Sequence, residues 1–198
     1  CTPHKQKMEQ SEMQAFEAFF DADGDSVSIT PRKVRTQALQ KMQEAKDSLV
    51  RYNYLAVASK TCLMSSDIDS ARLLTRQIED FTMKQPFSAQ LADLKSECYN
   101  MKGNVYARTG YMDSAEVYFR KAYEQRMQGT KIEVVPDILM NLADASNRLG
   151  RLDAGAAWYR RALILCDSLD IVSTKKPPIY YGLAQIYVAS VSYTHLTL

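Results

Sequence analysis

Apolar residues recur at helical spacing along most of the chain. The clearest stripes, with apolar side chains three or four positions apart, occupy residues 68–81, 112–123 and 152–169. Strict alternation of apolar and polar residues, which is typical of strands, is absent from every long segment. The pattern therefore predicts an all-α protein of about nine helices. We expect these helices over residues 6–20, 31–47, 49–64, 67–84, 88–109, 112–128, 136–149, 152–170 and 178–190.

Proline and glycine indicate where several of these helices begin and end. None of the six prolines falls inside a segment with helical spacing, where it would cost about 3 kcal/mol. Gly110 and Gly150 suit the left-handed turn that ends a helix. Neither residue type marks the break near residue 48, so one helix over 31–64 is the alternative to two helices there.

The chain contains an internal repeat. The segments that start at Gly103 and Ala143 align over twenty residues with a constant offset of 40 positions. Gly110 aligns with Gly150, and Phe119 aligns with Tyr159. A constant offset over chemically matched positions indicates duplicated structural units.

The repeated residues resemble the tetratricopeptide repeat family, whose pattern is W-x2-L-G-x2-Y, then A-x3-F, then a proline. The matching residues are Tyr99, Lys102, Gly103, Tyr106, Ala115 and Phe119 in one unit, Leu139, Leu142, Ala143, Ser146, Gly155 and Tyr159 in the next, and Tyr180, Leu183, Ala184 and Tyr187 in a third. Small residues at these positions let helices approach closely, and large ones fill the spaces between them. Asp69, Asp113 and Asp153 stand where second helices start, so we expect them to cap free amides and oppose the helix dipole.

The resemblance implies an α–α solenoid of antiparallel helix pairs. We expect a tether and capping helical hairpin over 1–48, and then repeats over residues 49–190. These repeats comprise a degenerate unit over 49–84, clear units over 88–128 and 136–170, and a truncated unit over 178–190. The offset of 40 exceeds the family's period of 34. The extra residues fall around 128–135 and imply longer helices or a longer loop.

In this family the first helix of each pair lines a concave face, where a peptide or partner helix binds. The resemblance implies a groove formed by Asn100, Asn104, Arg108, Met140, Asp144, Asn147, Arg148, Tyr181 and Gln185. Members that bind chaperone tails use a lysine-and-asparagine clamp. Asn104 matches the asparagine of that clamp, whereas Asn100 stands where the lysine belongs. The alternative is that these polar residues only face solvent.

Composition argues against several functional classes. The net charge of +2 gives no reason to expect a nucleic-acid partner, and no apolar run approaches the roughly 20 residues that span a membrane. The two histidines, His4 and His195, lie near the ends of the sequence. No catalytic triad, metal-ligand motif or phosphate loop can be built from the remaining residues. We therefore expect no enzyme, no cofactor, no metal site and no small-molecule substrate.

One acidic segment has part of a calcium-loop pattern. Asp21, Asp23 and Asp25 have the spacing of the first three ligands, but Ser26 and Arg32 replace the required glycine and glutamate. We expect a solvated turn there instead.

The cysteines divide into two groups. Cys62, Cys98 and Cys166 stand among apolar residues of expected helices, so we expect buried free thiols. Cys1 is followed by polar residues, and this start resembles a bacterial lipoprotein after removal of its signal peptide, with Cys1 lipidated. A lipid-anchored periplasmic or cell-envelope protein is the resulting expectation. The alternatives are an arbitrary fragment boundary and a cytoplasmic protein.

The last eight residues depart from the repeat pattern. After Ser190 the sequence reads VSYTHLTL, where the repeat calls for a turn and a second helix. This string resembles translated vector sequence, so we expect residues 191–198 to be a non-native tail and the native protein to continue.

The sequence predicts a non-enzymatic scaffold that binds a peptide or partner protein in its groove, with a membrane tether through Cys1 if that residue is lipidated. The alternative is a truncated sensory region of a sensor kinase or transcriptional regulator.

Overall fold

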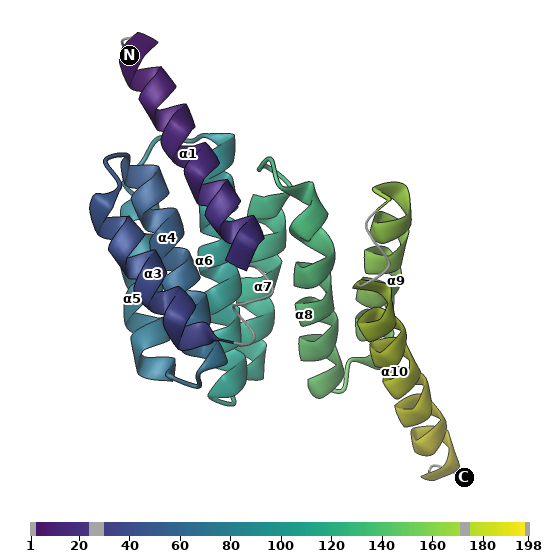
Figure 1. Cartoon of the computed structure of the whole chain (residues 1–198). Helices are drawn as coiled ribbons and strands as arrows, with labels where there is room; N and C mark the ends of the chain where they lie inside the picture. The colour runs from purple at the N-terminus through teal and green to yellow at the C-terminus, as the bar shows by residue number, and fades with distance from the viewer. Residues whose placement is uncertain (1–2, 24–29, 171–174, 197–198) are drawn as a thin grey trace. The chain divides into compact units, whose positions relative to one another are not determined.

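The computed structural model describes residues 3–23, 30–170 and 175–196. Within these residues the chain forms nine α-helices and one short 3-10 helix, with no strand (Figure 1). The helices are α1 (Pro3–Asp23), α3 (Pro31–Glu44), α4 (Ser48–Met64), α5 (Ile68–Thr82), α6 (Ala89–Arg108), α7 (Met112–Arg126), η1 (Ile132–Val134), α8 (Val135–Arg148), α9 (Leu152–Ser168) and α10 (Lys176–Leu196). The all-α prediction is confirmed. The last helix continues to Leu196, six residues past its expected end, because no glycine or proline interrupts residues 183–196.

The chain forms two compact units, Cys1–Phe87 and Ser88–Leu198. We call them unit 1 and unit 2 and describe each by itself. Unit 1 contains α1, α3, α4 and α5, and unit 2 contains α6 to α10. From α3 to α5 and from α6 to α10, consecutive helices pack against each other, as expected for stacked helix pairs, whereas α1 packs against α4.

In unit 1 the break near residue 48 is real, and side chains set its position. The Asp47 carboxylate accepts a hydrogen bond from the Val50 amide at 2.9 Å and so caps the start of α4. The Glu12 carboxylate on α1 accepts from the amides of Lys46 and Asp47, at 3.1 and 2.8 Å. These bonds satisfy amides that a continuous helix would pair internally, so two helices form rather than one.

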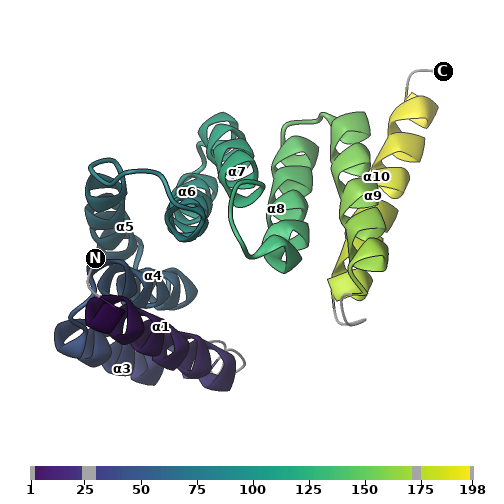
Figure 2. The ribbon, with the colours of Figure 1, turned by 90° about the horizontal axis from the view of Figure 1, so that it is seen from above.

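In unit 2, α6 to α9 follow one another in chain order (Figures 1 and 2). The turns that join α6 to α7 and α8 to α9 have the same hydrogen bonding. The Tyr111 amide donates to the Tyr106 carbonyl at 3.0 Å, and forty residues later the Arg151 amide donates to the Ser146 carbonyl at 2.9 Å. Glycines with positive φ, +87° and +74°, occupy the residue before each donor. The predicted left-handed turns at 110 and 150 are therefore confirmed.

The expected aspartate caps are wrong. Asp113 and Asp153 lie in the first turns of α7 and α9, and these two helices have no side-chain cap. Asp69 lies in the first turn of α5, whereas Asp67 caps that helix by accepting from the Ser70 amide at 3.2 Å. Each of these aspartates lies two residues after the N-cap position of its helix, which is too far along the helix to cap it. They still oppose the helix dipole.

Two glycines of unit 2 lie against large aromatic residues, and for Gly103 the repeat pattern predicts this close packing. A Cβ atom added to Gly103 would lie 2.4 Å from the Phe119 ring, and one added to Gly182 would lie 2.2 Å from the Tyr159 ring. Both rings are buried. The pattern does not hold at the start of the third unit, where Ala184 and Tyr187 are exposed.

A buried ion pair organises the connection between α7 and α8. The Asp93 carboxylate accepts from Arg126 Nη1 at 2.9 Å, from the amide and hydroxyl of Thr130 at 2.9 and 2.6 Å, and from the Lys131 amide at 3.3 Å. Arg126 is only 3% exposed and also donates to the Ser96 hydroxyl at 3.1 Å. The predicted longer loop is thus present, and it is fixed to the start of its own repeat.

Cys62, Cys98 and Cys166 are buried thiols that form no disulfide bond, as predicted. Among the helices in the described part of the chain, none combines the length and apolarity needed to cross a membrane. Cys1 and most of the candidate calcium loop, including Asp25, lie outside the described residues.

Candidate partner-binding face

The nine residues predicted to form the groove lie on three helices of unit 2. α6 carries three of them, α8 carries four and α10 carries two. Every one is half-buried or exposed, and none belongs to the core. We call these nine residues the first-helix face; they are Asn100, Asn104, Arg108, Met140, Asp144, Asn147, Arg148, Tyr181 and Gln185.

Contacts between the helices show that the first-helix face is continuous. Asn141 Nδ2 on α8 donates to Asn100 Oδ1 on α6 at 2.8 Å, so these two helices are neighbours. α10 packs against α8. Asn104 Nδ2 donates to the Asn100 carbonyl at 2.9 Å, which orients a second amide on the same stripe of α6. Sequence reasoning missed Asn141, although its position 41 residues after Asn100 nearly matches the repeat offset.

Asp144 makes a structural contact as well as lying on this face. Its carboxylate accepts a hydrogen bond from the hydroxyl of Tyr159 on α9. Burial raises the pKa of the Tyr159 phenol, and the bond to Asp144 raises it further. Asp144 therefore holds a buried phenol in its protonated form, which ties the first helix of this pair to the second.

We expect unit 2 to lose stability above about pH 10, and the Tyr159→Phe variant to lose less. A tyrosine whose folded pKa is raised contributes its full stabilisation below its unfolded pKa of about 10, and that contribution is lost as the pH rises through the folded pKa. The measurement is urea unfolding at several pH values between about 8 and 11.5, followed by the fluorescence of Trp158, the only tryptophan.

The control for this experiment is Tyr111→Phe, because Tyr111 is 65% exposed. Its pH dependence should match that of the unaltered protein. If Tyr159→Phe also matches the unaltered protein across this range, the account of the Asp144–Tyr159 pair is wrong.

Arginines on the second helices, α7 and α9, contact aromatic side chains. The Arg120 guanidinium lies 5.4 Å from the centre of the Trp158 ring, and the Arg161 guanidinium lies 5.2 Å from the centre of the Tyr123 ring. Arg160 donates to the Tyr187 hydroxyl at 3.2 Å. The basic pairs at 120–121 and 160–161 thus contact neighbouring aromatic residues within the fold.

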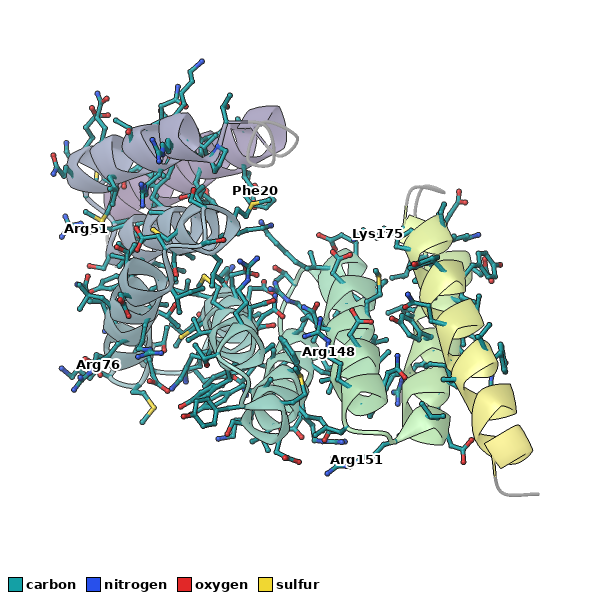
Figure 3. All side chains as sticks on the ribbon, turned by 90° about the horizontal axis from the view of Figure 1, so that it is seen from below. Phe20, Arg51, Arg76, Arg148, Arg151 and Lys175 are labelled. Carbon is teal, nitrogen blue, oxygen red and sulfur yellow. The ribbon has the colours of Figure 1, made fainter. Side chains whose placement is uncertain are left out.

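Different charged side chains lie near the two ends of α8 (Figure 3). At its start, Lys175 Nζ lies 2.9 Å from the Asp137 carboxylate and 3.0 Å from the Glu133 carbonyl. At its end, Arg148 is exposed, and Arg151 in the following turn pairs with Asp113 at 3.1 Å and with Glu116. Within the described residues no three His, Cys, Asp or Glu side chains are grouped so that they could hold a metal ion.

A family model described as tetratricopeptide repeat matches residues 96–126. This match covers most of α6 and all of α7. Its last residue, Arg126, donates a hydrogen bond to the hydroxyl of its first residue, Ser96. Residues 96–126 are similar to a tetratricopeptide repeat. This repeat supplies Asn100, Asn104 and Arg108 of the first-helix face. No curated protein matches the sequence.

A tetratricopeptide repeat in an all-α solenoid is typical of a protein-interaction scaffold. The pair α8–α9 repeats the turn of the matched pair at an offset of 40, which extends the same architecture along unit 2.

Proposed function

We propose that unit 2 binds a peptide or an extended segment of a partner protein along its first-helix face. The observation that carries this proposal is the distribution of side chains on α6, α8 and α10. The apolar sides of α8 and α10 form one core with α7 and α9, and Tyr106 and Ala107 of α6 pack against it. The nine residues of the first-helix face remain half-buried or exposed. Amide groups on the open side are partly oriented already, because Asn141 donates to Asn100 and Asn104 donates to the Asn100 carbonyl.

The chemistry of this face suits a peptide backbone. Asparagine amides both donate and accept hydrogen bonds, as peptide groups do. Asn104 and Asn147 lie on successive first helices and are half-buried, so a bound chain could contact both. Met140 and Tyr181 add apolar surface for the side chains of a ligand.

The test is selection of binders from a library of random peptides displayed on phage, with the full chain as target. We expect selected peptides to lose roughly 30-fold in affinity for the variant Asn104→Ala/Asn147→Ala, because each of the two lost hydrogen bonds costs about 1 kcal/mol. Neither side chain belongs to the core, so the melting temperature should change little.

The matched control is Arg161→Ala on the outer side of α9, which should leave peptide affinity unchanged. Selected peptides that bind the asparagine variant normally but lose affinity for the arginine control would contradict the proposal. The proposal would also be contradicted if the folded protein selected no peptide from the library.

A further inference from the structure

Two arginines of unit 2 differ from all the others. Residues 88–198 contain seven arginines, and five of them contact a carboxylate, a hydroxyl or an aromatic ring. Arg108 and Arg148 are exposed, and neither has a hydrogen bond, ion pair or ring contact in the described part of the chain. Since cations elsewhere in the unit find partners within the fold, these two are available to a ligand.

Their positions correspond in the repeat. Arg108 is the last residue of α6 and Arg148 is the last residue of α8, 40 positions later. The hydrogen bond between Asn100 and Asn141 shows that these two helices are neighbours. The two arginines therefore lie at the same end of the first-helix face, on neighbouring first helices.

The acidic groups on this side of the unit already have partners. Glu97 lies 3.5 Å from Arg126, Asp137 lies 2.9 Å from Lys175, and Asp144 accepts from the Tyr159 hydroxyl. On the first-helix face the two arginines are positive and Asp144, whose partner is a neutral phenol, is negative, so the net charge of the face is positive.

We infer that this face selects an acidic peptide segment, in which two carboxylates about three residues apart bind Arg108 and Arg148. The inference rests on the proposed function and names its ligand class. A peptide in the polyproline II conformation has three residues per turn and advances roughly 3.1 Å per residue, so side chains three positions apart lie on the same side, roughly 9 Å from each other, and can reach arginines on neighbouring helices. Guanidinium groups bind carboxylates through two parallel hydrogen bonds, which gives directional recognition as well as charge attraction.

An acidic peptide suits this surface better than a nucleic acid. Binding to a phosphate backbone depends on many cations acting together, and the whole chain has a net charge of only +2. Two arginines instead suit two separate carboxylates. Asn104 lies one turn before Arg108 on α6, where its amide is close enough to serve the same ligand.

The experiment measures fluorescence anisotropy of labelled, terminally blocked peptides with the full chain. The probe is an eight-residue peptide with two glutamates three positions apart, and its partner peptide has glutamine at both positions. We expect the diglutamate peptide to bind at least tenfold more tightly than the glutamine peptide. We also expect that advantage to weaken several-fold between about 50 and 300 mM salt.

The variants Arg108→Gln and Arg148→Gln should each remove most of this advantage, whereas Arg161→Gln on α9 should retain it. A purely structural role for the two arginines would instead lower the melting temperature and leave the ratio between the two peptides unchanged. Equal affinity for both peptides, no binding of the diglutamate peptide, or an equal effect of Arg161→Gln would overturn the inference.

Failure of this inference is distinguishable from failure of the proposed function. Neutral peptides from the random library that depend on Asn104 and Asn147, but not on the arginines, would overturn the acidic specificity and leave the binding face in place.

Discussion

Replacing Asp93 with alanine is expected to destabilise unit 2 by about 3–5 kcal/mol, because the change leaves the Arg126 guanidinium buried without its main partner. The same carboxylate also accepts from Thr130 and Lys131 in the loop before α8. Removing it therefore leaves the connection between two repeats without its anchor. Urea unfolding followed by the fluorescence of Trp158 measures this effect, because the only tryptophan lies in unit 2.

The control for this prediction is Asp113→Ala on α7. The Asp113 side chain is 78% exposed in its pair with Arg151, and exposed ion pairs contribute about 0–1 kcal/mol. The double variant Asp93→Leu/Arg126→Met should be less destabilised than the sum of its single variants, since it removes both buried charges together. A loss below about 1 kcal/mol for Asp93→Ala would show that the ion pair does not hold the connection.

Replacing Gly103 with valine is expected to destabilise unit 2 by about 3 kcal/mol, the upper end of the usual cost of overpacking a core. The first added carbon would already lie 2.4 Å from the Phe119 ring. The helix propensity of valine is slightly better than that of glycine, but this gain of a few tenths of a kcal/mol is small beside the steric cost. The same fluorescence measurement of urea unfolding tests the effect.

Two further variants separate close packing from other causes. Phe119→Leu combined with Gly103→Val should be more stable than Gly103→Val alone, because the smaller side chain makes room. Gly110→Ala should cost only about 1–2 kcal/mol, since that glycine has a φ of +87° but no atom within 4 Å of an added Cβ. If the free energy of unfolding of Gly103→Val lay within about 1 kcal/mol of that of the unaltered protein, the packing account would be contradicted.

Most of the helices in this fold were predictable because their boundaries are local. Periodicity indicated each helix, and Gly110 and Gly150 marked turns whose backbone needs positive φ. The break before Ser48 was harder to predict, because part of its cause lies 35 residues away in Glu12. Asp113 and Asp153 were misread because a tight glycine turn determines where each second helix starts.

Long-range polar contacts account for what the sequence did not predict. The extra residues near 130 suggested a longer loop, but nothing local indicated that Asp93 would bind it. The positions of Arg108 and Arg148 could be inferred from the repeat, whereas their lack of partners could not. Whether an arginine has a partner depends on which cations reach a carboxylate or an aromatic ring in the folded unit, and the packing of the helices determines this.

The central claim is that a ligand binds the first-helix face of unit 2, and amide chemical-shift mapping tests it most directly. A peptide selected from the random library is titrated into the isotope-labelled full chain. The account predicts shifts that cluster at Asn104 and Asn147 and their neighbours on α6 and α8. Shifts that instead cluster around Arg120 and Arg161, on the outer sides of α7 and α9, would contradict it.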